Sequence, residues 1–289
     1  MTPSPARVSP APFGAAADDR PLGQREFEQI AAMLYADSGI HLPDGKVSLV
    51  HSRLCKRLRA LGLESFGAYV SLVSSEAGVD ERRAMLSALT TNVTRFFREE
   101  HHFDDITARL QEGWADVARR GGKLRFWSSA CSSGEEPYSL ALTILGVLPD
   151  AASLDVKVLA TDIDPIIIEK AKRATYPEAS VSAVPDKLRQ RWLKRAGDSY
   201  TLADEARSLI TFRELNLMGA WPMKGQFNAI FCRNVAIYFD AETQERLWGR
   251  FAPLLAPGGR LYIGHSERVG DPRFEAVGQT AYRLKGGAA

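Results

Sequence analysis

The feature that most constrains the fold is an alternation of two hydrophobic patterns that begins near residue 123. Short apolar runs typical of buried strands are each followed by a longer run with helical spacing. Strands separated by helices of this length predict a parallel sheet with helices on both faces. The strand-like runs are 123–129, 155–164, 227–234 and 258–266, and the helical runs are 135–148, 165–176 and 241–255.

The rest of the chain divides around this pattern. Between about residues 21 and 110 the apolar spacing is helical throughout, which predicts a separate all-helical domain. Residues 118–289 are expected to form the α/β domain, and a short segment at about 196–214, strand-like on both sides, fits a small antiparallel β insertion. Residues 1–20 are rich in Pro, Ala and Ser and are expected to form a disordered tail.

Composition argues against several classes of protein. The chain carries 37 Lys and Arg against 35 Asp and Glu, a net charge of +2, so we expect no nucleic-acid partner. No apolar run approaches the roughly 20 residues that span a bilayer, so we expect no membrane insertion. The three cysteines match no zinc spacing, and an odd number of cysteines without a signal peptide favours reduced thiols in a cytoplasmic protein that binds no metal.

Residues 127–141 form the first candidate site. They lie between a strand-like and a helical run, at a turn where backbone N–H groups often bind phosphate. A phosphate site favours glycines and a lysine, whereas this stretch has one glycine, Gly134, followed by Glu135 and Glu136, which favour a cationic ligand. A second explanation stays open, a capping box from Ser133 to Glu136 that only begins the helix. Both explanations hold if Glu135 stabilises the start of the helix and Glu136 binds the ligand.

Asp162 ends the next strand-like run. An acid at this point of an α/β unit often accepts hydrogen bonds from ribose hydroxyls. The alternative is an N-cap for the following helix, but Asp164, directly before Pro165, is better placed for that role. The helix needs only one capping acid, and Asp164 is the better placed of the two. This favours Asp162 as a ribose ligand. A nucleoside with a cationic head fits both sites, and S-adenosylmethionine is such a molecule.

The carboxylate of S-adenosylmethionine needs a cation, and residues 90–103 offer two. Arg95 and Arg98 lie there, with Asn92 and Thr94 nearby, and an arginine presents a planar fork that suits a carboxylate. The alternative, which the residues alone favour, is a solvated helix face above an aromatic core.

Residues 231–240 carry a third polar group after a strand. Arg233 and Asn234 follow an apolar run and are unsuited to a core. Tyr238 either presents its hydroxyl to a reacting centre or serves as an aromatic anchor, and the sequence does not separate these roles.

Taken together, these segments resemble the CheR family, the glutamate O-methyltransferases of chemotaxis receptors. The matching segments are TTNVTRFFRE, WSSACSSGEEPYSLA, ATDID, LNLM, FCRNVAIYFD and GGRLYIGHSE, and the likeness runs from about Glu26 to Leu284. The resemblance implies a helical N-terminal domain, a Rossmann-like α/β methyltransferase sheet and a small antiparallel insertion. It also implies methyl transfer from S-adenosylmethionine to glutamate carboxylates of chemoreceptors, forming 5-O-methyl esters for sensory adaptation and leaving S-adenosylhomocysteine.

The resemblance assigns roles to particular residues. Arg98 is expected to bind the cofactor's carboxylate, Glu136 its ammonium and Asp162 its ribose. Tyr238 is expected beside the reacting methyl group. We also expect Tyr238 and Arg233 to orient the incoming carboxylate, Arg233 indirectly. The other residues implied to line the cofactor pocket are Asn92, Thr94, Asn216, Leu217 and Asn234, together with Arg233.

Receptor binding is the last expectation. A solvated face is the ordinary explanation of the basic residues on the second predicted helix, but the resemblance makes them a docking surface for the acid-rich methylation helices of receptors. Some family members also carry an additional Gly-containing loop in the insertion and bind a C-terminal receptor tether. Residues 196–206 are compact and lack a Gly-x-Gly loop, so tether binding is not favoured. The docking residues are Arg53, Lys56, Arg57 and Arg59.

Two other functions stay open. One is a methyltransferase of the same fold with a small-molecule or nucleic-acid substrate, and the other is a non-enzymatic module that senses S-adenosylmethionine. The chain shows no His/Asp or Cys/His arrangement typical of a general base. Glutamate methylation needs none, because a carboxyl with a pKa near 4.3 is already ionised at neutral pH.

Overall fold

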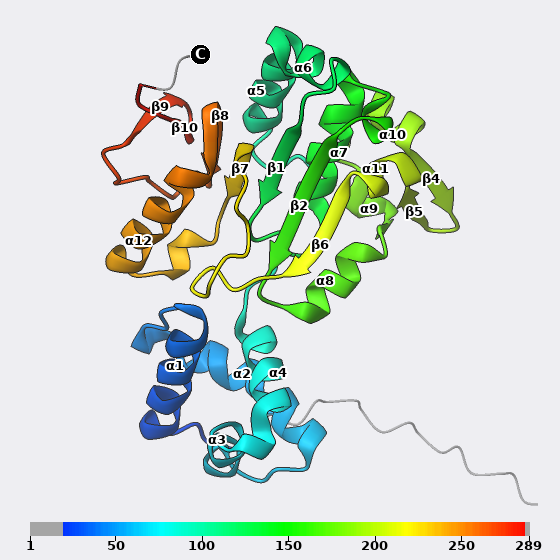
Figure 1. Cartoon of the computed structure of the whole chain (residues 1–289). Helices are drawn as coiled ribbons and strands as arrows, with labels where there is room; N and C mark the ends of the chain where they lie inside the picture. The colour runs from blue at the N-terminus through cyan, green and yellow to red at the C-terminus, as the bar shows by residue number, and fades with distance from the viewer. Residues whose placement is uncertain (1–19, 287–289) are drawn as a thin grey trace, which may run out of the picture.

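The computed structural model describes residues 20–286, which form a helical domain followed by an α/β domain (Figure 1). The helical domain lies beyond the carboxyl ends of the central strands, where open α/β folds bind their ligands (Figure 1). No helix within residues 20–286 is long and apolar enough to cross a membrane. The tail predicted for residues 1–20 lies outside the described residues, except for Arg20.

Four α-helices of the described chain build the helical domain around one apolar core. Phe27, Ile30 and Leu34 of α1 enter that core because they recur at helical spacing on one face. α1 ends at Gly39, whose φ of 73° is the left-handed conformation that commonly follows a helix. The helices are α1 (Gln24–Ser38), α2 (Val47–Leu61), α3 (Phe66–Val73) and α4 (Val79–Leu89), with one-turn helices η1 (Asp44–Lys46) and η2 (Glu76–Gly78) between them.

The α/β domain is built on a seven-stranded sheet with the order β6-β2-β1-β7-β8-β10-β9. The five strands from β6 to β8 are parallel, and β10 and β9 are antiparallel. The chain runs outward from β1 to β2 and β6 and then returns to β7 on the other side of β1, so the strand order reverses between β1 and β7. The strands are β1 (Leu124–Ser128), β2 (Val156–Asp162), β6 (Ile210–Glu214), β7 (Phe227–Cys232), β8 (Leu255–Ile263), β9 (Phe274–Gly278) and β10 (Ala281–Leu284).

Helices cover both faces of this sheet, which confirms the predicted fold class. Successive strand residues point to opposite faces, and Phe126 and Trp127 of β1 accordingly belong to different apolar cores. Phe126 shares its core with Leu140 of α7, and Trp127 shares the other with Leu247 of α12. The helices are α7 (Glu135–Val147), α8 (Pro165–Lys172), α11 (Asp204–Ser208) and α12 (Ala241–Phe251), with one-turn helices η4 (Ala151–Ser153), η5 (Ala236–Tyr238) and η6 (Ala252–Leu254).

The helical domain ends earlier than the predicted boundary at residue 110. Phe103 and Ile106 of α5 (His101–Arg109) lie in the core of the sheet domain, and no residue of α5 belongs to the core of the four preceding helices. A helical pattern does not show which domain's core a helix packs into. The predicted boundary was therefore wrong and lies about one helix too late in the chain. The segment continues through a π-helical turn, η3 (Leu110–Trp114), into α6 (Ala115–Arg119).

The antiparallel insertion is present, but its predicted limits of 196–214 are also wrong. Residues 210–214 form β6, which pairs with β2 in the parallel sheet. The insertion is a separate sheet of order β3-β5-β4 that begins well before residue 196. A strand of four or five residues carries too little pattern to identify its sheet. The elements are β3 (Thr175–Pro177), α9 (Glu178–Val181), α10 (Asp186–Trp192), β4 (Leu193–Ala196) and β5 (Ser199–Leu202).

Candidate functional site

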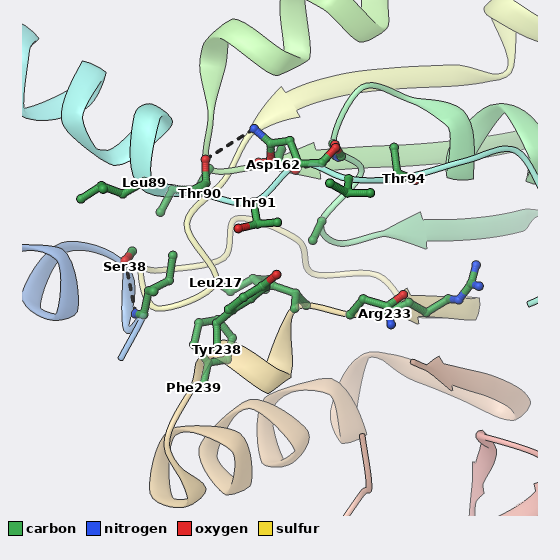
Figure 2. A pocket seen from close by; sticks show the side chains of 18 of the residues that line it. Ser38, Leu89, Thr90, Thr91, Thr94, Asp162, Leu217, Arg233, Tyr238 and Phe239 are labelled. Carbon is green, nitrogen blue, oxygen red and sulfur yellow. Dashed lines mark hydrogen bonds between the residues drawn. The ribbon is translucent and has the colours of Figure 1, made fainter. Parts of the chain in front are cut away.

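A pocket that is partly open to solvent lies where the carboxyl ends of the strands meet the helical domain. Figure 2 shows Thr90, Thr91 and Asp162 on one side of it and Leu217 and Tyr238 on the other. The sequence reasoning selected ten residues for a cofactor and its reaction, and all ten line this pocket. They are Asn92, Thr94, Arg98, Glu136, Asp162, Asn216, Leu217, Arg233, Asn234 and Tyr238.

The turn after β1 presents Glu136 to the pocket. Its Oε1 accepts a hydrogen bond of 2.7 Å from Ser128 Oγ, and its Oε2 accepts one of 3.1 Å from Arg233 Nη1. The capping box does not form: the N-cap residue is Gly134, no side chain caps the helix, and the Ser133 hydroxyl donates to Glu135 Oε2 at 2.6 Å. Burial raises the pKa of Glu136 above its usual range, although Arg233 opposes this rise.

Arg233 is a buried residue that stabilises the site through its contacts with neighbouring side chains and backbone. Its side chain is only 2% exposed, and Figure 2 shows it extending away from Tyr238. Besides Glu136, the guanidinium lies 3.4 Å from Glu99 Oε2 and donates to the Arg98 carbonyl. Burial opposes ionisation of Glu99, but Arg233, hydrogen bonds from His265 and the charge of Arg98 together outweigh it and hold the pKa of Glu99 below its usual value. Glu99 escaped the sequence analysis because nothing local connects it to Arg233.

Asp162 is a preorganised acceptor at the end of β2. Its Oδ2 accepts from Ser132 N at 2.7 Å and its Oδ1 from Asp164 N at 3.1 Å. Each carboxylate oxygen has a second lone pair for a ligand hydroxyl. Burial raises the pKa of Asp162 to about 6, so the carboxylate is ionised at neutral pH but titrates close below it.

Asp164 performs the capping role predicted for it. Its Oδ1 accepts from Ile166 N at 2.9 Å at the start of α8. Its Oδ2 accepts from Ser87 Oγ at 2.8 Å and from Asn92 Nδ2 at 3.1 Å. Because Ser87 belongs to α4, the cap also connects the two domains.

The segment that carries Arg98 is irregular and has no helix in it. Phe97 and Glu99 have φ values of 51° and 57°, the left-handed region that non-glycine residues rarely adopt. Phe96 is buried, as the core explanation required, and Arg98 donates from Nη1 to Val93 O at 3.2 Å. The prediction of a helix face is therefore wrong for this segment. Its two arginines, Arg95 and Arg98, do line the pocket.

Comparison with known proteins decides the family. Residues 25–90 match the family model for the CheR methyltransferase all-alpha domain, and residues 92–283 match that for the CheR methyltransferase SAM binding domain. The chain belongs to the CheR methyltransferase family. The predictions of a methyltransferase and of S-adenosylmethionine (SAM) as its cofactor are thereby confirmed.

Several relatives match most of their own length. A probable chemotaxis protein methyltransferase of Rhizobium etli is 50% identical over 258 residues, covering 87% of this chain and 96% of that protein. The chemotaxis protein methyltransferase of Klebsiella aerogenes is 39% identical, covering 98% of this chain and 97% of the relative. That of Escherichia coli is 41% identical, covering 91% of this chain and 92% of the relative.

In this CheR chain the basic face of α2 is partly used for the fold. Arg53 Nη1 donates to the Leu89 and Thr90 carbonyls at 2.7 and 2.8 Å, which satisfies the end of α4. Arg57 forms a two-pronged pair with Glu81, with distances of 3.0 and 2.5 Å. Two basic residues of this face are exposed, Lys56 and Arg59.

One wall of the pocket was missed by the sequence analysis. The segment between α1 and α2 contributes Ile40, His41 and Lys46. His41 N donates to Tyr238 O at 2.8 Å, and Asn216 Nδ2 donates to Asp37 O at 2.5 Å. These contacts join residues about 200 positions apart, for which a single sequence contains no signal.

Proposed function

We propose that this protein transfers the methyl group of S-adenosylmethionine to glutamate side chains of chemotaxis receptors, forming glutamate 5-O-methyl esters. The observation that carries the proposal is the single pocket described above. It combines buried carboxylates, a nearby arginine and a tyrosine at the carboxyl ends of strands where α/β folds bind ligands. The relatives are named chemotaxis protein methyltransferases, which supports a chemotaxis protein as the substrate class.

The residues of the pocket fit the groups of S-adenosylmethionine one by one. Glu136 offers a carboxylate oxygen to the ammonium, and Arg233 favours the charged form of that carboxylate against the effect of its burial. Asp162 accepts from the ribose hydroxyls, and Arg98 pairs with the carboxylate. Two of these three groups are carboxylates, which repel a phosphate, and this agrees with a nucleoside that carries none.

The cofactor, when bound, supplies a methyl group activated by the sulfonium. The protein then has to place the acceptor oxygen in line with it, and positioning of this kind lowers a barrier by roughly 7–11 kcal/mol. Tyr238 is the pocket residue suited to orient the acceptor, since no described residue hydrogen-bonds to its hydroxyl. Arg233 acts indirectly, because its guanidinium is occupied by Glu136, Glu99 and the Arg98 carbonyl. A guanidinium bound to the acceptor itself would weaken its attack.

Receptor docking is proposed for α2. An acid-rich receptor helix suits a basic face, and steering between opposite charges raises association rates at low salt. Lys56 and Arg59 are exposed, whereas Arg53 and Arg57 support the fold. The role therefore rests mainly on Lys56.

The test incubates the protein with methyl-labelled S-adenosylmethionine and cytoplasmic fragments of receptors from the same cell. Label that enters the receptor and leaves as methanol in mild base identifies a carboxyl methyl ester. Glu136→Gln is expected to abolish labelling, and the exposed control Glu245→Gln to leave it unchanged. Label that survives base indicates another acceptor, and cofactor binding without labelling of any receptor favours a sensing module.

A second arm tests the docking surface. Lys56→Glu is expected to raise the KM for the receptor and to reduce the salt dependence of binding, without changing cofactor affinity. The matched control is Lys187→Glu, an exposed lysine on α10 of the insertion. Equal effects of the two variants would place docking elsewhere.

A further inference from the structure

Four backbone N–H groups converge on the side chain of Glu267, a residue to which nothing above gives a role. Glu267 Oε1 accepts from Val235 N at 2.9 Å and from Ile237 N at 3.2 Å. Its Oε2 accepts from Asn234 N at 2.9 Å and from Gly264 N at 2.5 Å. The side chain is buried, with 5% of the residue exposed. Two oxygens thus satisfy four donors, and three of these belong to the loop after β7.

That loop is the part of the pocket that carries Asn234 and Tyr238. Asn234 has a φ of 58°, in the left-handed region that few non-glycine residues adopt and that asparagine tolerates best. The N–H groups of Asn234 and of the next residue, Val235, point to one carboxylate, which is the geometry of an anion site made by successive backbone amides. Here the anion is a side chain of the protein itself.

Gly264, at the end of β8, makes this close approach possible. A Cβ at Gly264 would lie 2.4 Å from Asn234 Nδ2 and 2.8 Å from Asn234 N, closer than carbon atoms come to such groups. Only a residue without a side chain therefore fits against the loop. Gly264 and Glu267 sit in the same short turn, so one turn after β8 both receives the loop and binds its N–H groups.

Other contacts satisfy the loop's carbonyl groups. Gln244 Nε2 of α12 donates to the Ala236 and Phe239 carbonyls at 3.0 Å each. His41 N donates to Tyr238 O at 2.8 Å. The N–H groups of the loop are thus bound by Glu267, and its C=O groups by Gln244 and His41. Loss of Glu267 removes three of these six bonds.

We propose that Glu267 is a positioning residue for methyl transfer, which fixes the Asn234–Tyr238 loop so that Tyr238 and Asn234 face the reacting groups. The inference rests on the proposed function, because it concerns the geometry of that reaction. A glutamine cannot replace Glu267, since its single carbonyl oxygen serves two N–H groups and its NH₂ faces the other two. Glu267→Gln is therefore a variant of equal size that disrupts the loop.

The test compares steady-state methylation of a receptor fragment by wild type, Glu267→Gln and the control Glu275→Gln. Glu275 is a partly exposed partner of Arg283 in the β9–β10 hairpin, outside the pocket. Displacements near 1 Å cost up to about 100-fold, so we expect kcat of Glu267→Gln to fall roughly 10- to 100-fold. The KM for the receptor should stay within about twofold, because α2 is untouched. Cofactor affinity, measured by calorimetry, should change far less than kcat.

Gly264→Ala provides an independent arm. It keeps the carboxylate but pushes the loop away, so the same loss of kcat with unchanged receptor KM is expected. Near-UV circular dichroism at the assay temperature checks that each variant is folded. The proposal is overturned if folded Glu267→Gln keeps wild-type kcat, or if its whole loss lies in receptor KM or in cofactor affinity. If wild type itself transfers no methyl group, the proposed function fails instead, and the two failures are distinguished.

Discussion

Replacing Arg233 by methionine tests whether the buried charges of the site depend on one cation. The Arg233 guanidinium lies 3.1 Å from Glu136 and 3.4 Å from Glu99, and both carboxylate side chains are only 11% exposed. Removing one partner of a buried ion pair leaves an uncompensated charge and costs about 3–5 kcal/mol. Methionine is long and apolar, so the loss reports the missing charge more than a cavity. We expect Arg233→Met to reduce the free energy of unfolding by about this amount.

A second substitution makes the interpretation specific. In Arg233→Met the two carboxylates lose their arginine, and Glu136→Gln removes one of these charges while keeping an acceptor for Ser128. The double variant should therefore recover roughly half of the lost stability, a non-additivity that independent sites do not show. The loss of unfolding free energy in Arg233→Met should also be smaller at pH 5 than at pH 7. Carboxyls whose pKa is raised in the folded state bind more protons there than in the unfolded state, so falling pH favours the folded state.

Denaturation in urea followed by tryptophan fluorescence is the assay. The five tryptophans lie between Trp114 and Trp248, so the signal reports the α/β domain that contains Arg233. The matched control is Arg173→Met, an exposed arginine of the same domain, which should stay within about 0.5 kcal/mol of wild type. A loss below about 1 kcal/mol, the size typical of exposed pairs, refutes the reasoning. So does a double variant that is no more stable than Arg233→Met.

Three further predictions concern cofactor binding, the stability of the helical domain and receptor docking. Burial raises the pKa of Asp162 to about 6, and only the ionised carboxylate keeps all its acceptors for ribose. The Kd for S-adenosylhomocysteine, measured by calorimetry, should therefore rise as pH falls through about 6, and Asp162→Asn should weaken binding at pH 7 and flatten this dependence. Arg53→Ala should destabilise the helical domain by about 1–3 kcal/mol in far-UV circular dichroism melts, because it leaves the carbonyls at the end of α4 unsatisfied. Lys56→Ala should keep that stability and raise the KM for the receptor.

The sequence was most informative where function and local chemistry coincide. Glu136 and Asp162 follow strand-like runs, and the carboxyl ends of parallel strands meet at one edge, so their proximity followed from the pattern alone. Asp164 was separable from Asp162 because a proline after it marks a helix start. These positions obey rules that operate over a few residues.

Other features depend on contacts between distant segments, which periodicity does not contain. The pattern of α5 is helical in either domain, and only its packing against the sheet decides that Phe103 lies in that core. β6 has the length and composition of an insertion strand, and only its pairing with β2 places it in the main sheet. Glu267 has no local signal at all, because its four hydrogen-bond donors lie in a turn beside it and in a loop some 30 residues earlier.

The pocket depends on the junction between the domains as much as on the sheet. Its wall from the helical domain is held by backbone and side-chain bonds to the same segments that carry the proposed site, at Asn216, Tyr238 and Asp164. A hydrogen bond of 2.6 Å from Tyr35 to Asp240 adds to these at the surface. Because the junction residues are also neighbours of the pocket, a ligand that fills the pocket contacts both domains at once. A ligand that binds only to the assembled pocket therefore stabilises the contact between the two domains. This stabilisation equals the part of the binding free energy that depends on that contact. The arrangement of the helical domain, and with it the direction of α2, is in this way coupled to the occupancy of the cofactor site.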